Sequence, residues 1–129
     1  MRAIPPQLLL RADAVTYAVF GVLLLLAPNQ DLFDTLGLPQ PSPELFTQLA
    51  GALLVTFAIL LWEAPSNPAF EHHVGRAAAI ANTLGAVIFL RWLLVGDLDT
   101  TNLGTTLLWV ITLGSAVFAV LESRYLRPS

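Results

Sequence analysis

The residues of this sequence that could carry out chemistry are charged and amide groups set inside long apolar stretches. Asp13 is the first of them, about two turns into the earliest stretch. If that stretch crosses a membrane, a carboxylate there is costly and indicates an ion pair or a proton pathway. An ion pair with Arg11, Arg76 or Arg124 would lock helix ends together, whereas an unpaired acid could carry protons in transport. The nearby arginines favour the ion pair.

A second candidate site lies late in the third apolar stretch, where Arg91 precedes Trp92. An arginine near a membrane boundary can extend its guanidinium outward to acidic loops or to lipid phosphate. The same group could instead bind an anion or a quinone carbonyl, with Gln48 and Trp92 as neighbours at similar depth. The predicted ligand-binding residues are therefore Arg91, Trp92, Gln48, Asp13 and Asn82.

Amide and hydroxyl groups deeper in the stretches are expected to join helices by hydrogen bonds. Asn82 and Thr83 lie near the middle of the third stretch. Such bonds are worth about 0.6 to 2 kcal/mol each within a membrane. The partners available from other stretches are Thr16, Tyr17, Thr56, Thr112 and Ser115.

Neither a metal site nor an enzyme active site is expected. His72 and His73 are adjacent, so on a helix their side chains diverge by about 100° and cannot easily bind one ion. No further histidine or cysteine completes a site, and a solvated inner loop is the favoured interpretation of this segment. Glu63, Glu71 and Glu122 share the inner surface without a spacing typical of paired catalytic carboxylates. The sequence thus predicts a protein with no metal, no cofactor and no enzymatic activity.

Composition assigns the chain to the membrane proteins. Of its 129 residues, 56% are hydrophobic and 12% are charged, and the mean hydropathy is +0.72. Soluble domains carry about a quarter of their residues charged, so a soluble fold could not hide this much apolar surface. The length leaves room for four spans of about 20 residues with short loops, which predicts a single membrane domain over 1–129. The net charge of −3 gives no general attraction to nucleic acid.

The expected fold is all-α, a bundle of four transmembrane helices. The predicted spans are 7–27, 45–64, 74–95 and 103–121. Ser42 is expected to cap the second helix, with Pro43 at its first position. The first stretch is expected to be retained rather than cleaved as a signal peptide, because Leu25 stands where cleavage after Ala27 needs a small residue.

The positions of the arginines predict the orientation of the spans. The first and third connections contain no Lys or Arg, and they carry the acids Asp31, Asp34, Asp97 and Asp99. The arginines of the termini and of the second connection are Arg2, Arg11, Arg76, Arg124 and Arg127. By the positive-inside rule, both termini and the second connection are predicted to face the cytoplasm.

The first outer connection is expected to contain a short interfacial helix. Leu32, Phe33 and Leu36 can share one face of such a helix, with Asp31 beside them, and Gly37 is a typical helix end. A packed surface turn is the simplest use of this segment, and a lid over the outer mouth of the bundle is the alternative. Proline residues follow it and lead to the second span.

Small residues indicate where the helices should pack closely. Helix association in lipid depends on Gly, Ala and Ser at four-residue spacing, because lipid gives no hydrophobic drive between helices. Ala77, Ala81 and Gly85 form such a row, which predicts that the third span is the central and most tightly packed helix. One point of close approach is expected on each remaining span, at Gly21, Gly51 and Gly114.

Several features follow one another in a recognisable order along the first part of the chain. They are Arg11 at the start of the first span, Gly21 within it, Leu-Ala-Pro at 26–28 and Leu-Gly-Leu-Pro at 36–39. This order resembles the small bacterial four-helix membrane proteins grouped as DoxX-like, over about residues 8–62. The resemblance implies a four-helix fold in a bacterial inner membrane, and some members of the group are accessory subunits of respiratory quinone-linked enzymes. The acid that those proteins often carry in the second span is absent here, where Gln48 and Thr56 are the polar groups.

Two functions fit these features. The first is a non-catalytic accessory or lipid- or quinone-contacting subunit of the inner (plasma) membrane, with Arg91 and Gln48 near the outer face. The second is a small dimeric transporter or channel that uses Asp13. The expected partners are accordingly the lipid bilayer, a lipid or quinone, and a membrane protein partner or a second copy of the chain.

Overall fold

The structure is a computed structural model that describes residues 4–39, 42–96 and 98–127. These residues are helical apart from short connections, and they contain no strand. Arg2 and Asp97, which contribute to the predicted orientation, lie outside the described residues.

Five α-helices and two short 3₁₀ helices make up the described chain. In order they are α1 Pro6–Leu25, α2 Gln30–Leu36, α3 Glu44–Glu63, η1 Ala64–Ser66, α4 Pro68–Val95, α5 Asn102–Glu122 and η2 Ser123–Leu126. The helices α1, α3, α4 and α5 are long and apolar enough to cross a membrane, and they match the four predicted spans.

Two helix starts differ from the prediction. α4 begins at Pro68, so His72 and His73 lie on its first turns rather than in a loop. The cause is Asn67, whose side chain accepts a hydrogen bond from the backbone N–H of Ala69 and caps the helix. α3 begins at Glu44 with Pro43 in the cap position and no side-chain cap, so the predicted cap at Ser42 is wrong.

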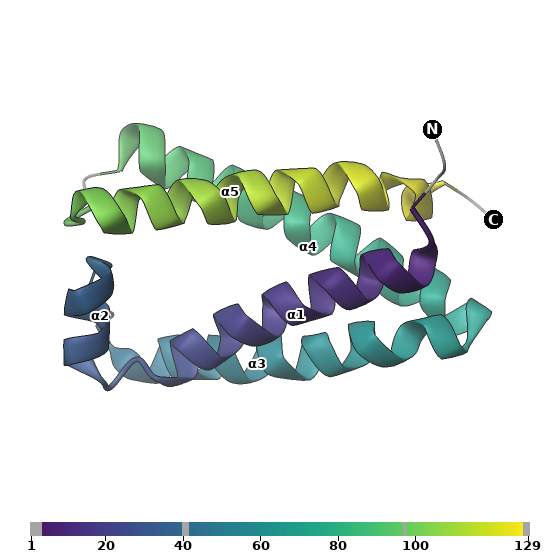
Figure 1. Cartoon of the computed structure of the whole chain (residues 1–129), viewed down its shortest axis with the longest axis horizontal. Coiled ribbons are helices and arrows are strands. Elements are labelled where there is room, and N and C mark those ends of the chain that lie inside the picture. The colour runs from purple at the N-terminus through teal and green to yellow at the C-terminus, as the bar shows by residue number, and fades with distance from the viewer. Residues whose placement is uncertain (1–3, 40–41, 97, 128–129) are drawn as a thin grey trace.

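The long helices form two antiparallel pairs (Figure 1). α1 packs along α3 and α4 packs along α5, and these are the most extensive helix contacts in the described chain. The α1–α3 pair is the first pair and the α4–α5 pair is the second pair. The start of α1, the α3–α4 connection and η2 lie at one end of the bundle, the terminal end, and α2 lies at the other, the α2 end.

The first pair is joined at the two glycines that the sequence singled out. A Cβ added to Gly21 would lie 2.9 Å from the carbonyl oxygen of Gly51, and one added to Gly51 would lie 2.7 Å from that of Gly21. Real Cβ atoms do not approach backbone so closely, so the two helices touch through their backbones here. The predicted close approach at both residues is confirmed.

The second pair corrects the predicted packing. Ala77, from the predicted row of small residues, is exposed, while Gly75, Ala78 and Ala79 are the buried small residues of α4. A Cβ added to Gly114 would meet no atom within 4 Å, so α5 is not closely approached there. The third span is therefore one member of a pair rather than the central helix of the bundle.

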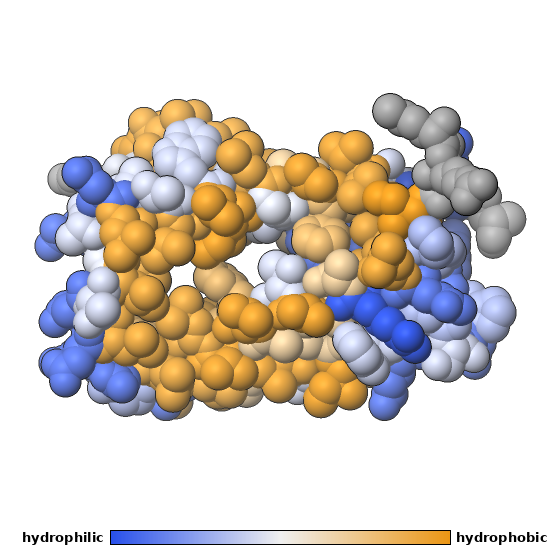
Figure 2. All heavy atoms as spheres, viewed as in Figure 1, coloured by the Kyte–Doolittle hydropathy of each residue, from blue (hydrophilic) through white to orange (hydrophobic). Residues whose placement is uncertain are grey.

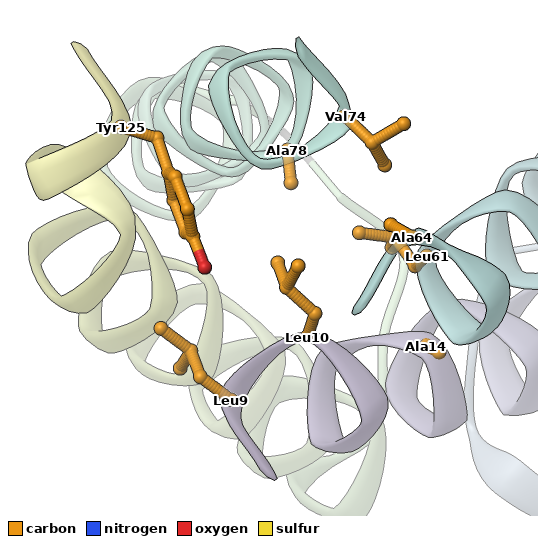
Figure 3. Close-up of a cluster of buried hydrophobic side chains, with 8 residues drawn as sticks. All are labelled: Leu9, Leu10, Ala14, Leu61, Ala64, Val74, Ala78 and Tyr125. Carbon is orange, nitrogen blue, oxygen red and sulfur yellow. The ribbon is translucent and has the colours of Figure 1, made fainter. Parts of the chain in front are cut away.

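At the terminal end the two pairs meet in an apolar cluster (Figure 3). Tyr125 of η2 points its ring toward Leu9 and Leu10 of α1 and packs flat against Gly75 of α4. The remaining members come from α1, α3, η1 and α4: Ala14, Leu61, Ala64, Val74 and Ala78. This layer excludes water from the groups that lie one helical turn deeper.

At the α2 end the pairs are joined through α2. Gly37 ends this helix in the left-handed conformation, with φ of 64°, as the sequence predicted. Its carbonyl accepts a hydrogen bond from the backbone N–H of Thr101, just before α5, at 3.1 Å. Gly104 of α5 lies directly against the Gly37 carbonyl, so the first turn of α5 packs on the end of α2.

Between these two ends the pairs separate. Figure 2 shows an opening between the upper and lower helix pairs, toward the α2 end, with hydrophobic residues along its borders. Phe20 of α1 and Phe89 of α4 make an edge-to-face contact across the pairs, with ring centroids 5.9 Å apart. The bundle is thus joined at both ends and hollow in part of its middle.

Candidate functional site

Polar groups from three helices meet at Asn82. Its amide nitrogen donates to Asp13 Oδ2 at 2.8 Å and to Glu122 Oε2 at 3.0 Å. Its carbonyl oxygen accepts a longer bond, 3.4 Å, from the hydroxyl of Tyr17. These four residues are called the acid–amide cluster below. The cluster links the first pair, through α1, to both helices of the second pair.

The acids and the amide of the cluster are buried, and Tyr17 is partly buried. Asp13 and Glu122 have 0% of their surface exposed, and Asn82 has 4%. Each acid uses one oxygen toward Asn82, while Asp13 Oδ1 and Glu122 Oε1 are buried without a hydrogen-bond partner. A buried polar atom without a partner is costly, and a buried charge costs far more. The two free oxygens are therefore the least satisfied atoms of the site.

Helical spacing brings Asp13, Asn82 and Glu122 to the same level along the bundle. On α1, Leu10, Asp13 and Tyr17 follow one another at three- and four-residue steps, so they share one face. On α4, Asn82 lies one turn beyond the buried Ala78. Glu122 is the last residue of α5, one turn before Tyr125.

Apolar layers close the cluster on both sides along the bundle. Toward the terminal end lies the cluster of Figure 3 that includes Leu10 and Tyr125. Toward the middle, the Tyr17 ring packs edge-on against Phe57 of α3, with centroids 5.1 Å apart. Phe118 of α5 packs against the same core. The acids thus lie between apolar layers and have no exposed surface.

The ion pair that the sequence favoured for Asp13 is not formed among the described residues. Arg11 points away and places its guanidinium 5.3 Å from the centre of the Trp62 ring. Arg124 donates to the backbone oxygen of Ile4 at 2.9 Å and Arg76 is exposed. Asp13 meets an amide and a second acid because its side chain faces the second pair.

Glu122 is the member of the acid–amide cluster that was not among the predicted site residues. It was assigned to the inner surface, one position beyond the expected end of the fourth span, yet it is fully buried. Its helical spacing could have indicated this burial. Steps of seven residues connect Leu108 to Ser115 and Ser115 to Glu122, so the three residues share one face of α5. The expectation that Glu122 lies on the inner surface is therefore wrong.

Asn82 does join helices, as predicted, but most of the hydroxyl groups do not. Thr83 donates to the carbonyl of Ala79 in its own helix, at 2.7 Å. Such back-bonding satisfies a hydroxyl without a neighbour. The same four-residue pattern holds for Thr16, Thr56 and Thr112.

The other predicted ligand residues lie away from the acid–amide cluster. Arg91 is exposed on α4, with its guanidinium 5.8 Å from the centre of the Trp92 ring, and both residues border a surface cavity of about 80 Å³. Gln48 of α3 donates to the carbonyl of Leu25 at the end of α1, at 3.4 Å. Gln48 thus belongs to the first pair, and Arg91 and Trp92 belong to the second.

A larger, open cavity of about 540 Å³ lies at the α2 end. It forms where the end of α2 meets the connection between α4 and α5. Its lining residues are Asp34, Gly37, Leu38, Pro39, Leu98, Asp99, Thr100 and Thr101.

Polar contacts also cover the outside of the terminal end. The Tyr125 hydroxyl donates to Glu71 at 3.0 Å, and Arg124 lies over the Tyr125 ring at 5.1 Å. His72 and His73 contact each other edge-on, with centroids 6.2 Å apart. No group of three His, Cys, Asp or Glu that could hold a metal ion occurs within 4–39, 42–96 and 98–127.

Comparison with known proteins found no match for this chain among family models, curated proteins or solved structures.

Proposed function

We propose that this chain is a small, non-catalytic membrane protein that binds the hydrocarbon tail of a membrane lipid or quinone between its two helix pairs. The observation that carries the proposal is the opening in Figure 2, which is bordered by hydrophobic residues and closed at both ends by contacts between the pairs. In a membrane, an apolar opening beside lipid fills with hydrocarbon, because water cannot satisfy its hydrogen bonds there.

The ends of the opening differ in chemistry, which supports an amphiphile with a polar head. Toward the terminal end lies the acid–amide cluster, with Tyr17 as the group nearest the middle of the bundle. Toward the α2 end lies the open cavity that includes Asp99 and Thr101. A polar headgroup would sit at that second end, in contact with water, with its tail between the pairs. In this proposal Arg91, Trp92 and Gln48 contact headgroups at the same end.

Native mass spectrometry of the full chain from mild detergent tests the proposal. The expected result is a fixed number of retained amphiphiles per chain that survives delipidating washes. Mass and ultraviolet absorbance distinguish the two sources, because a phospholipid differs in mass from a quinone and only the quinone absorbs. A chain that retains neither in detergent, and that takes up neither from lipid nanodiscs, overturns the proposal.

The resemblance to DoxX-like proteins supports the accessory role. In that role the chain joins a larger membrane assembly as a subunit without chemistry of its own. Mild solubilisation with a tag on the C-terminus should then recover a second membrane protein or a second copy of the chain in fixed ratio.

A proton-coupled transporter is the second candidate, and the burial of Asp13 favours it. A carboxylate at membrane depth without an arginine partner is the feature that such transport needs. Proteoliposomes that carry the chain should then show proton movement that Asp13→Asn abolishes. Equal proton movement in both forms rules this function out, and it leaves the amphiphile proposal standing.

The proposed location is a bacterial inner membrane, with both termini in the cytoplasm. Arg11, Arg76, Arg124 and Arg127 lie at or near the terminal end, which supports this orientation by the positive-inside rule. A tag in α2 should be labelled only from outside the cell. Labelling from the cytosol alone contradicts the orientation.

A further inference from the structure

Two acids from opposite ends of the chain accept hydrogen bonds from a single nitrogen. Asp13 Oδ2 and Glu122 Oε2 both accept a hydrogen bond from Asn82 Nδ2. The distance between these two oxygens therefore cannot exceed the sum of the two hydrogen-bond lengths. Their side chains are also close enough to hydrogen-bond to each other. A bond between two carboxyl groups exists only if one of them carries a proton, because an ionised carboxylate has no hydrogen to donate.

The free oxygens agree with that arrangement. Asp13 Oδ1 and Glu122 Oε1 are buried and have no partner among the described residues. As two ionised groups they would leave two charged acceptors unsatisfied in a water-free layer. A proton on one of these oxygens removes one charge and turns an unpaired acceptor into a donor.

The charges around the cluster permit one negative charge rather than two. From α1, Arg11 faces away onto Trp62, and from α4, Arg76 is exposed and Glu71 accepts from Tyr125. From α3 the charged residues are Glu44, which begins the helix at the α2 end, and Glu63, whose side chain is exposed.

From η2, Arg124 is close enough to attract Glu122 electrostatically. One cation offsets one carboxylate, and the second acid has no described cation beside it. Two ionised carboxylates at this separation in a low-dielectric layer repel strongly, and such pairs titrate as a unit that keeps one proton.

We propose that Asp13 and Glu122 form a proton-binding site in which the two carboxyl groups share one proton, with Asn82 holding both in place. Tyr17 fixes the orientation of Asn82, because its hydroxyl donates to the amide oxygen and so turns the N–H groups toward the acids. The site requires neither a bound amphiphile nor transport. A result that contradicts the proposed function would therefore not contradict the proton-binding site.

Infrared spectroscopy of the full chain in lipid nanodiscs tests the proposal directly. A protonated carboxyl group has a carbonyl stretching band that an ionised carboxylate lacks, and the band moves in heavy water when the proton exchanges. The wild-type chain should show one such group per molecule at neutral pH. Asp13→Asn combined with Glu122→Gln should remove the band, whereas the control Glu63→Gln, at an exposed acid, should leave it unchanged.

The single variants distinguish a shared proton from one that belongs to one acid. With sharing, Asp13→Asn and Glu122→Gln each change the pH midpoint of the band left by the other acid, by about tenfold or more in proton concentration. The proposal is overturned if Glu122→Gln removes the band while Asp13→Asn leaves its pH midpoint at the wild-type value. That result would show that Glu122 holds the proton alone. Absence of the band in the wild type, or its survival in the double variant, overturns it as well.

A measurement on the wild type covers the case in which the variants fail to fold. A membrane-soluble carbodiimide reacts with protonated carboxyl groups, so it should modify Asp13 or Glu122, as mapped by mass spectrometry. A water-soluble carbodiimide should instead modify exposed acids such as Glu63. Absence of membrane-soluble label on both cluster acids contradicts the proposal.

Discussion

Asp13 of α1 and Glu122 of α5 meet at one amide nitrogen, and neither acid has any exposed surface. This relationship joins the two helix pairs at a point where the rest of their contact is apolar. The stability of the bundle should therefore depend on the shared donor more than on either acid alone.

Asn82→Leu tests that dependence. The substitution keeps an apolar side chain of similar size but leaves two buried acids without their donor, at a cost of about 1–3 kcal/mol for each group left unsatisfied. The measurement is the free energy of unfolding in mixtures of mild detergent and dodecyl sulfate. Thr83→Val is the matched control, because the Thr83 hydroxyl bonds only within its own helix and its loss should change little. Equal effects of the two variants would contradict this account.

Arg11→Gln tests the absence of an ion pair at Asp13. The guanidinium of Arg11 lies over the exposed ring of Trp62, a contact worth about 0.5–1 kcal/mol. The loss in unfolding free energy should stay within that range and should be matched by Trp62→Leu. A loss as large as that of Asn82→Leu would mean that Arg11 does pair with Asp13.

Gly21→Val should separate the helices of the first pair. The added carbons would meet the backbone of α3 at Gly51 and Val55, and inserting atoms into such a contact costs about 1–3 kcal/mol or more. Gly114→Ala is the control on α5, where an added Cβ meets no atom, so stability should hold or rise slightly. The check is thermal unfolding of both variants in the same detergent, and a stable Gly21→Val chain would show that α1 and α3 do not pack through these residues.

The variants Gly75→Leu and Tyr125→Phe should differ sharply in how well the terminal end stays packed. A Cβ at Gly75 would lie 2.6 Å from the Tyr125 ring, so leucine displaces the ring from the apolar cluster. Tyr125→Phe keeps the ring and removes only the hydroxyl bond to Glu71, worth about 1 kcal/mol. Intrinsic protein fluorescence and thermal unfolding should report loss of packing in the first variant and near-normal behaviour in the second. The reverse order would mean that the hydrogen bond, rather than the ring, holds the terminal end.

Gly37→Ala should loosen the α2 end. The residue has a positive φ and lies against Thr101, so a side chain is strained by its backbone and also crowded. The expected result is faster hydrogen exchange at the Thr101 N–H, which donates to the Gly37 carbonyl, with exchange at Asn82 unchanged. Unchanged exchange at Thr101 would show that this contact does not hold the two pairs together.

The sequence was sufficient for the elements and for part of the packing. Span length and apolar content predicted α1, α3, α4 and α5, and the Gly37 stop predicted the end of α2. Gly21 and Gly51 were identified because a residue without a side chain is the main route to close packing in lipid. These features depend on one helix at a time or on one residue type.

The features that the sequence did not predict depend on how helices rotate and pair. α4 carries small residues on two faces, and a periodic pattern cannot tell whether Ala77 or Ala78 faces a neighbour. The rotation observed is the one that turns Asn82 toward Asp13 and Glu122. Glu122 was missed for the same reason, since an acid at a helix end is ordinarily solvated and only its three-dimensional partners show otherwise.

The arrangement of α1 and α5 also dictates when the polar layer can be completed during synthesis. The ribosome releases the first helix long before the last, so Asp13 enters the bilayer while Glu122 is still being made. The earlier helices can assemble as a hairpin through Gly21 and Gly51 without it. Asn82 gains its second acceptor only when the final residue of α5 arrives, which makes this contact a marker that α5 has been inserted.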